Sequence, residues 1–311
     1  MPCGARKLTP MPELPEVETI RRQLAPLVEG RRLERIEIFD ERWSRPLAPG
    51  ELAAALEGRR VERLGRRGKY LVWSFEDDVH LAQHLRMTGG VLWEPESEPT
   101  HVRVRLQLAR GGRGVARSRL LITDVRRFGT GELLLGADAL EAFFAARVGL
   151  EPLDERFTAQ HLRALLRGRR APIKAVLLDQ RHIAGVGNIY ADEALFRARL
   201  HPLRPAGRLT RPQHASLRLG LIEALCAGVD AKGASIDDFR HVDGLRGAFQ
   251  DQFLVHRRAG EPCPRCGTEI VRMVVAGRGT YVCEHCQRRP RRSRARRRRA
   301  RRGAPTRASG G

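Results

Sequence analysis

The first strong hydrophobic pattern lies near the N-terminus, in the run PEVETIRRQLAPLV that begins at Pro15. Its apolar residues Val17, Ile20, Leu24 and Leu27 are three or four positions apart, which is the spacing of one helix face. A proline at the start and glutamates in the first turn are typical of a helix N-terminus. The pattern therefore predicts one amphipathic helix.

Short segments of the β type follow this helix. In the clearest one, Val102, Val104, Leu106 and Leu108 alternate with polar side chains, which is the pattern of a strand with one wet face. Short strands at such spacing suggest a sandwich or a barrel. The predicted strands cover residues 33–39, 69–75, 79–85, 102–108, 120–123 and 131–135.

The pattern becomes helical after about Ala137, and the turn-forming residues between Gly149 and Pro152 predict a hinge. From Cys263 onward, two β-like runs at 270–275 and 280–283 predict a compact hairpin. The predicted helices of the second half cover residues 138–148, 158–166, 172–179, 188–197 and 210–227.

The charge balance narrows the choice of partner. The 311 residues, enough for roughly two domains, contain 58 Lys and Arg against 36 Asp and Glu, a net charge of +22. Twelve arginines and no acid lie between Arg288 and Gly311, and the rest of the chain still carries +10. Both parts are basic, which indicates a polyanionic partner.

The sequence contains no membrane or secretion signal. No apolar run approaches the roughly 18 residues of a membrane span, and the N-terminus lacks the apolar segment of a signal peptide. We therefore expect a cytoplasmic protein with no membrane partner. We expect the arginine-rich tail after Gln287 to be disordered and to raise non-specific affinity for DNA through phosphate contacts. A solubilising or protein-binding tail is the alternative.

Four of the six cysteines form two C-x-x-C pairs with sixteen residues between the pairs. A hairpin that brings two such pairs together supplies four thiolates, the ligand set of a closed tetrahedral zinc site. We predict one structural Zn²⁺, which contributes folding energy and no catalysis because no position is left for water. The alternative is four ordinary buried thiols. The predicted ligands are Cys263, Cys266, Cys283 and Cys286.

A second chemical signal is the run MPELPEVE at residues 11–18. If Met11 is the first residue and is removed, Pro12 carries a free secondary amine. An α-amino group titrates near pH ~8, so part of it is neutral at physiological pH and can form an iminium with an aldehyde-like carbon. Glu13 and Glu16 supply carboxyls within reach. The alternative is that the prolines only begin a helix.

Several motifs occur together along the chain: MPELPEVET at 11–19, GKYL at 68–71, HLRMTG at 84–89, DVRRFG at 124–129, GVGNIYADE at 185–193 and the four cysteines. In this order and spacing, over about Pro12 to Gln287, they resemble the formamidopyrimidine-DNA glycosylase family. This bacterial family repairs 8-oxoguanine and formamidopyrimidines by base excision.

The resemblance implies an α+β multidomain protein that binds damaged double-stranded DNA in a cleft between its domains. We expect a monomer that associates with the nucleoid through its DNA binding. The expected parts are an N-terminal extension (1–11), a catalytic β-sandwich domain with one leading helix (12–148), a hinge (149–153), a helical helix-two-turns-helix domain (154–254), a β-hairpin zinc finger (255–287) and a disordered basic tail (288–311).

The resemblance also implies a bifunctional DNA glycosylase and AP lyase. Pro12 would displace the oxidised base through a Schiff base on the sugar, and β,δ-elimination would then cut the strand. Glu13 would protonate the ring oxygen of the sugar, with Glu16 in a supporting role. Lys69 would contact the lesion and its phosphate. A strand-end lysine and a helix-start glutamate are the ordinary interpretations of Lys69 and Glu16.

The remaining matches concern DNA. A nucleotide drawn out of the stack leaves a gap that side chains must fill, and the resemblance gives this role to Met87, Arg126 and Phe128. Burial statistics alone would place Met87 and Phe128 in the core. Contacts with the DNA backbone are implied for His101, Arg127, Lys174, Asn188 and Arg278.

The motif GVGNIYADE predicts a turn followed by a helix. Gly185 and Gly187 allow close approach of the backbone, and Asn188 can cap the helix and offer its amide to a phosphate at the positive end of the helix dipole. The ordinary alternative is a glycine-rich turn without a ligand.

Two features depart from the family pattern. The ten residues before Met11 would make Pro12 an unreactive tertiary amide, so we expect translation to begin at Met11. The segment KGAS at 232–235 stands where relatives carry a loop rich in glycine and threonine. The alternatives are an endonuclease VIII-like glycosylase for oxidised pyrimidines, which Leu14 disfavours, and a non-catalytic zinc-containing DNA-binding protein if Met1 is the true start.

Overall fold

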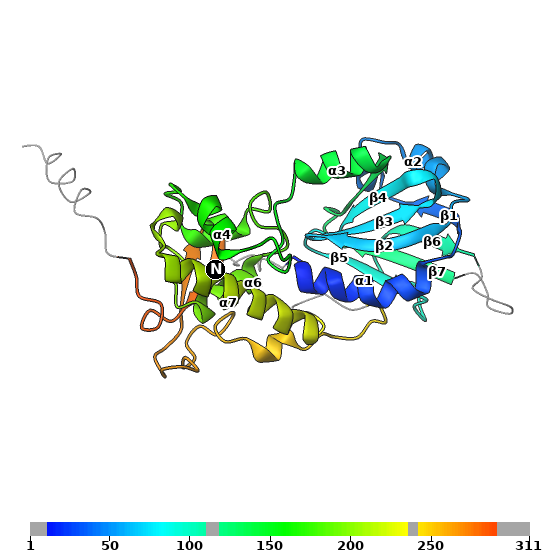
Figure 1. Ribbon diagram of the computed structural model, residues 1–311. Coiled ribbons are helices and arrows are strands. Elements are labelled where there is room, and N and C mark those ends of the chain that lie inside the picture. The colour runs from blue at the N-terminus through cyan, green and yellow to red at the C-terminus, as the bar shows by residue number, and fades with distance from the viewer. Residues whose placement is uncertain (1–10, 110–117, 236–241, 291–311) are drawn as a thin grey trace, which may run out of the picture.

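The computed structural model describes residues 11–109, 118–235 and 242–290. The extension before Met11 and the basic tail beyond Pro290 lie outside the described residues. Figure 1 shows the strands of a β-sandwich on one side of the molecule and the helices α4, α6 and α7 on the other. The predicted order of a sandwich, a helical region and a C-terminal hairpin is confirmed.

The sandwich consists of two antiparallel four-stranded sheets, with the strand orders β1-β6-β7-β5 and β2-β3-β4-β8. In β6, Val104, Leu106 and Leu108 point into the core as the alternation predicts. The polar residues that alternate with them are only partly buried: Arg103, Arg105 and Gln107. The strands are β1 (Leu33–Ile38), β2 (Val61–Arg67), β3 (Tyr70–Phe75), β4 (Val79–His84), β5 (Gly89–Trp93), β6 (Val102–Leu108), β7 (Ser118–Asp124) and β8 (Thr130–Leu135).

Two helices complete this half, α1 (Leu14–Val28) and α2 (Pro49–Leu56), and α3 (Ala137–Ala145) follows β8. Helix α3 covers the outer face of the second sheet and falls within residues 12–148, the expected bounds of the sandwich domain. Its Phe143 and Phe144 rings meet Tyr70 edge-on, with ring centroids 5.7 and 5.5 Å apart. The central strands β3 and β4 of this sheet are therefore buried on both faces.

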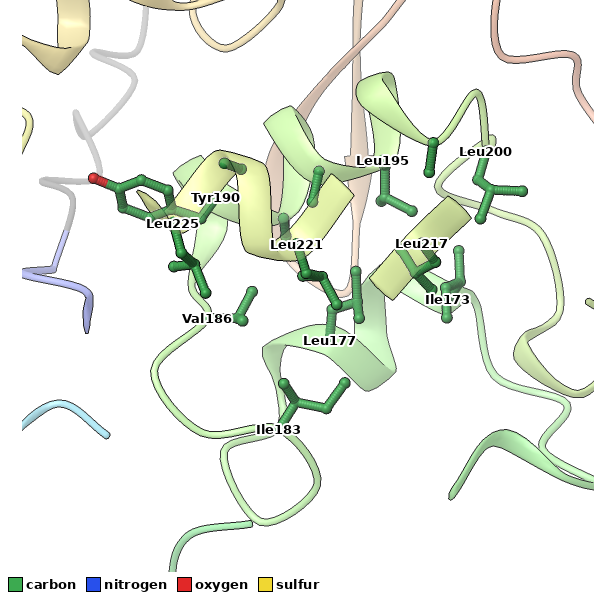
Figure 2. Close-up of a cluster of buried hydrophobic side chains, with 14 of the residues drawn as sticks. Ile173, Leu177, Ile183, Val186, Tyr190, Leu195, Leu200, Leu217, Leu221 and Leu225 are labelled. Carbon is green, nitrogen blue, oxygen red and sulfur yellow. The ribbon is translucent and has the colours of Figure 1, made fainter. Parts of the chain in front are cut away.

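The helical half packs four helices around one core, and Figure 2 shows part of this core, including Ile173, Leu177 and Leu217. Glycines let α7 lie close against α6, because a Cβ at Gly220 would come within 2.7 Å of the Ala194 carbonyl oxygen. The helices are α4 (Ala159–Leu166), α5 (Ile173–Leu178), α6 (Asn188–Arg197) and α7 (Arg211–Asp230). Among the described residues, none of the helices is long and apolar enough to cross a membrane.

The C-terminal hairpin pairs β9 (Val271–Val275) with β10 (Arg278–Val282) in antiparallel register. A small core of Phe196, Val255, Ile270 and neighbouring cysteines fixes the hairpin to the helical half. The short 3₁₀ helices are η1 (Glu41–Trp43), η2 (Glu76–Asp78), η3 (Ala206–Arg208) and η4 (Phe249–Gln252).

Candidate active site and DNA interface

The segment expected to carry the chemistry lies at the junction of the two halves, in the first turn of α1. Glu13 is the N-cap of this helix, and its backbone N–H donates to Oε2 of Glu16 at 2.9 Å. Pro12 and Glu13 are both buried, and only 2 % of Glu13 is exposed. The predicted helix start is confirmed, with its glutamates turned inward.

The carboxylate of Glu13 binds the N-terminus of α6. It accepts hydrogen bonds from the backbone N–H groups of Gly187 at 2.6 Å, Ile189 at 2.9 Å and Tyr190 at 3.4 Å. The positive end of a helix attracts an anion. The sequence predicted a DNA phosphate at this position, whereas the structure places the protein's own carboxylate there.

Two glycines of the motif GVGNIYADE make this contact possible. A Cβ at Gly187 would lie 2.3 Å from Cδ of Glu13, a distance that no side chain tolerates. Gly185 has φ +83°, and its carbonyl accepts the N–H of Leu14 at 3.0 Å. The two glycines therefore allow the turn before α6 to approach the start of α1 closely.

Asn188 differs from its prediction. The N-cap of α6 is Gly187, and the Asn188 amide nitrogen donates to the carbonyl of Gly279 in the hairpin at 2.9 Å. Its Oδ1 atom is buried and has no hydrogen-bond partner among the described residues. The amide therefore links α6 to the hairpin in this structure.

Lys174 also differs from its prediction, because a DNA-facing lysine needs an exposed ammonium and this side chain has no exposed surface. Its ammonium donates to Asp192 at 2.6 Å, to the Thr280 hydroxyl at 2.8 Å and to the Gly279 carbonyl at 3.3 Å. Asp192 also pairs with His256 at 2.9 Å. This buried network joins α5 and α6 to the hairpin.

Burial shifts the pKa values of two interacting groups in the site, the Glu13 carboxyl and the Lys69 ammonium. Burial raises the pKa of the Glu13 carboxyl to about 7, against the charge of Lys69, which lowers it. Burial lowers the pKa of the Lys69 ammonium, and the charges of Glu13 and Glu16 oppose that change. Lys69 is 2 % exposed and precedes β3 directly. The structure thus brings Pro12, Glu13 and Lys69 into one buried site.

Glu16 connects this site to the segment KGAS. Its Oε1 accepts the Tyr190 hydroxyl at 2.7 Å and the backbone N–H of Ala234 at 2.8 Å. Gly233 has φ +77°, and a Cβ there would come within 3.0 Å of the Glu16 side chain. Burial raises the pKa of the Glu16 carboxyl. Glu16 therefore links α1 to Tyr190 of α6 and to the backbone of the segment KGAS.

The three side chains expected to fill the DNA gap lie together and outside the core. Sδ of Met87 is 3.3 Å from a guanidinium nitrogen of Arg126, whose central carbon lies 4.8 Å from the centre of the Phe128 ring. Phe128 is 49 % exposed. The site therefore presents an aromatic ring to solvent, with an arginine over it and a thioether beside the arginine.

Three of the five residues expected to contact phosphates remain accessible. His101, Arg127 and Arg278 are exposed. His101 and Arg127 have positive φ angles of 64° and 59°, conformations that non-glycine residues adopt rarely. The guanidinium of Arg127 lies 3.6 Å from the carboxylate of Asp40.

The four cysteines form one cluster. Their Sγ atoms all lie within 4.8 Å of one another, with Cys263 and Cys286 at 4.0 Å and Cys266 and Cys283 at 3.5 Å. A tetrahedral zinc ion with Zn–S bonds of ~2.3 Å separates its sulfurs by about 3.8 Å. The cluster matches the size and chemistry of a zinc site.

Sequence reasoning missed several buried polar residues. Asp124 opens the motif DVRRFG and binds its backbone, as aspartates that begin turns do. Glu193 accepts the N–H groups of Leu254, Val255 and His256 at 2.9 to 3.1 Å. Asp124 is the one acid beside two arginines in DVRRFG, and Glu193 stands beside Asp192 in the otherwise uncharged motif GVGNIYADE. Acids in these positions could have indicated structural anions.

The sandwich, the glycine turn leading into α6 and the four-cysteine hairpin together define a zinc-finger protein of the helix-two-turns-helix class. Family models named Formamidopyrimidine-DNA glycosylase N-terminal domain, Formamidopyrimidine-DNA glycosylase H2TH domain and Zinc finger found in FPG and IleRS match residues 11–131, 148–240 and 260–289. The chain belongs to the formamidopyrimidine-DNA glycosylase family.

Curated relatives extend over nearly the same residues. Formamidopyrimidine-DNA glycosylase of Chloroflexus aurantiacus is 46% identical over 283 residues, covering 89% of this chain and 98% of that protein. The Thermus thermophilus protein of the same name is 45% identical over 279 residues, with 89% and 98% covered.

Solved structures agree. A Lactococcus lactis FPG mutant in complex with Fapy-dG DNA superposes with a TM-score of 0.82 at 35% identity, covering 89% of this chain and 100% of that chain. MutM (FPG) from Thermus thermophilus gives a TM-score of 0.79 at 45% identity, with 89% and 98% covered. MutM in complex with DNA containing carbocyclic 8-oxo-G gives 0.81 at 36% identity, with 89% and 100% covered.

Proposed function

We propose that this protein is a bifunctional DNA glycosylase and AP lyase of base excision repair that removes oxidised purines, including 8-oxoguanine and formamidopyrimidines, from duplex DNA. The observation that carries the proposal is the buried group of Pro12, Glu13 and Lys69 at the junction of the two halves, with the Glu13 pKa at about 7. Membership of the family and its solved DNA complexes support it.

The chemistry assigned to these residues requires Pro12 as the mature N-terminus. Its neutral amine attacks the anomeric carbon, the N–C bond forms, and the glycosidic bond breaks with its electron pair leaving on the base, which takes up the proton that the amine nitrogen loses. Glu13 gives its proton to the ring oxygen, so the sugar opens and the nitrogen becomes an iminium. Loss of a proton from the adjacent sugar carbon then expels the 3′ phosphate, and a second elimination expels the 5′ phosphate.

The exposed group of Met87, Arg126 and Phe128 supports a role in opening the duplex. An enzyme that acts on a base must draw the nucleotide out of the stack. Met87 and Phe128 would occupy the gap, and the planar guanidinium of Arg126 would face the orphaned partner base. We assign phosphate contacts to His101, Arg127 and Arg278, which are exposed.

We assign one structural Zn²⁺ to the four cysteines. Four thiolates complete a tetrahedral shell and leave no position for a catalytic water. The ion would hold the two turns of the hairpin together and so keep Arg278 at its place beside β9. Bound zinc therefore supplies stability to the hairpin and takes no part in the reaction at Pro12.

Borohydride trapping on a duplex that contains 8-oxoguanine tests the function. Reduction of an iminium leaves a stable protein–DNA adduct, which the proposal expects for protein that begins at Pro12. The matched control is the chain with Met1 to Met11 retained, where Pro12 is an amide and no adduct through it is expected. Intact mass of the native protein establishes which terminus exists. Binding without an adduct from protein that begins at Pro12 would indicate a non-catalytic DNA-binding protein.

A lesion panel extends this test to oxidised pyrimidines. The wild-type Lactococcus lactis FPG, 35% identical to this chain, has been solved with DNA containing an oxidised pyrimidine. We expect excision of 8-oxoguanine and formamidopyrimidines to be faster than excision of oxidised pyrimidines. The reverse order would favour an endonuclease VIII-like preference.

A further inference from the structure

Asp124 lies at the end of β7, where it is 2 % exposed and has no role in the proposed chemistry. Its Oδ2 atom accepts the backbone N–H groups of Phe128 and Gly129, each at 2.7 Å. One carboxylate oxygen therefore holds the far end of the loop that presents Phe128.

The other oxygen of Asp124 reaches a second loop. Oδ1 accepts the hydroxyl of Thr88 and the backbone N–H of Arg126, the latter at 3.1 Å. The Thr88 hydroxyl oxygen also accepts that same N–H at 3.1 Å. Thr88 follows Met87 directly in the chain. The Asp124 carboxylate thus joins the loop that carries Met87 to the loop that carries Arg126 and Phe128.

The frame behind these loops is packed against the sandwich. A Cβ at Gly131 would lie 2.3 Å from the ring of Trp43, and one at Gly129 would lie 3.2 Å from Asp124. Asp124 is also paired across the sheet with Gly89. The backbone of these two loops is therefore held against the sandwich, while the side chains of Met87, Arg126 and Phe128 lie outside the core.

We propose that Asp124, together with Thr88, is a positioning residue that holds Met87, Arg126 and Phe128 as a single preformed wedge for entry into the duplex. This inference rests on the proposed function, which gives the three side chains the task of filling the gap. Hydrogen bonds to an ionised acceptor are the strong ones. A loop ordered before binding does not lose its conformational freedom when the duplex opens.

The test uses Asp124→Asn, which keeps the size of the side chain but turns an amide N–H₂ toward backbone donors. The matched pair Thr88→Val and Thr88→Ser removes or keeps one hydroxyl. Two rates are measured under single-turnover conditions: release of 8-oxoguanine opposite cytosine or adenine, and the fluorescence rise of 2-aminopurine placed beside the lesion, which reports unstacking.

We expect Asp124→Asn and Thr88→Val to slow unstacking and excision about tenfold, the effect of one lost hydrogen bond to a buried group. Any difference in rate between cytosine and adenine opposite the lesion should shrink with them, because Arg126, which would face the partner base, loses its fixed place. Thr88→Ser should recover most of the rate.

A double-mutant cycle separates positioning from general stability. If Asp124 acts through the wedge, adding Asp124→Asn to Phe128→Ala costs much less than Asp124→Asn costs in the wild type. The proposal would be overturned if the rate losses of the two single variants multiply fully in the double variant. It would also be overturned if Asp124→Asn had the unstacking rate and base preference of the wild type. Thermal unfolding and zinc content confirm that each variant is folded. Failure of the wild type to excise any lesion would instead refute the proposed function.

Discussion

The pH dependence of base excision is the sharpest consequence of the Glu13 environment. Glu13 must be protonated to donate to the sugar, and burial raises its pKa to about 7. The Pro12 amine must be neutral, and an α-amino group titrates near pH ~8. The rate should therefore rise at low pH, where the amine is losing its proton, and fall at high pH, where Glu13 is ionised, which gives a bell-shaped profile with its optimum between the two pKa values.

The magnitude follows from the two pKa values. With pKa values near 7 and ~8, about 6% of molecules hold both groups in their reactive forms at the optimum between them. A carboxyl at the ordinary value of 4.5 would reduce that fraction to roughly 0.03%. Burial of Glu13 therefore raises the reactive population by roughly 200-fold, as estimated from these values.

Glu16→Gln is the diagnostic perturbation. The charge of Glu16 is one of the causes that raise the Glu13 pKa, so its removal should shift the Glu13 transition to lower pH. Glu13→Gln should abolish that transition and most of the rate. Glu223→Gln, at an exposed position of α7, is the control. The assay is single-turnover release of 8-oxoguanine from about pH 5 to about pH 9.

Two results would refute this reasoning. One is a Glu13→Gln variant that keeps the same pH transition, because the transition would then belong to another group. The other is a Glu16→Gln variant whose transition stays at the wild-type pH, because the charge of Glu16 would then have no influence on the acid.

Three further predictions concern the buried contacts at Gly187, the Lys174–Asp192 pair and the four-cysteine cluster. Gly187→Ala places a Cβ 2.3 Å from Cδ of Glu13 and should lower excision at least tenfold, measured with zinc content as the folding control; a wild-type rate would contradict the role of this glycine. Asp192→Asn leaves the buried Lys174 ammonium without its counter-charge and should cost about 3–5 kcal/mol in urea unfolding, while an added Lys174→Met should restore part of it; no recovery would argue against the pair. Chelation of zinc, or Cys283→Ser, should weaken binding to an abasic duplex, and added zinc should reverse the chelator effect but not that of Cys283→Ser; unchanged binding after proven metal loss would exclude a role of the ion.

Strong periodicity made most elements predictable. α6 occupies the predicted residues 188–197, and β6 the predicted residues 102–108. β2 was missed because VERLGRR carries three arginines and a glycine, so its pairing with β3 decides its conformation. β5 was missed because it begins with Gly89 and Gly90, which have low strand propensity. Such strands form through tertiary pairing rather than local preference.

The residues of the candidate site could be predicted from the sequence, but most of their contacts could not. The motifs identified the residues, whereas the partners of Glu13, Lys174 and Asn188 depend on which chain segments meet in space. Asn188 and Lys174 bind the hairpin residues Gly279 and Thr280, about ninety and one hundred positions later in the chain. Local sequence contains no information on such pairings.

Because α1 packs against both halves of the molecule, the pKa of Glu13 depends on how the two halves pack together. Leu14 packs in the helical core, while Val17, Ile20 and Leu24 pack in the sandwich core. The Glu13 carboxyl is bonded to the start of α6, and burial is the largest cause of its raised pKa. If the halves separate, water reaches the carboxylate and its pKa returns toward 4.5. The group would then be ionised at neutral pH, so alignment of the two halves is a condition for proton donation.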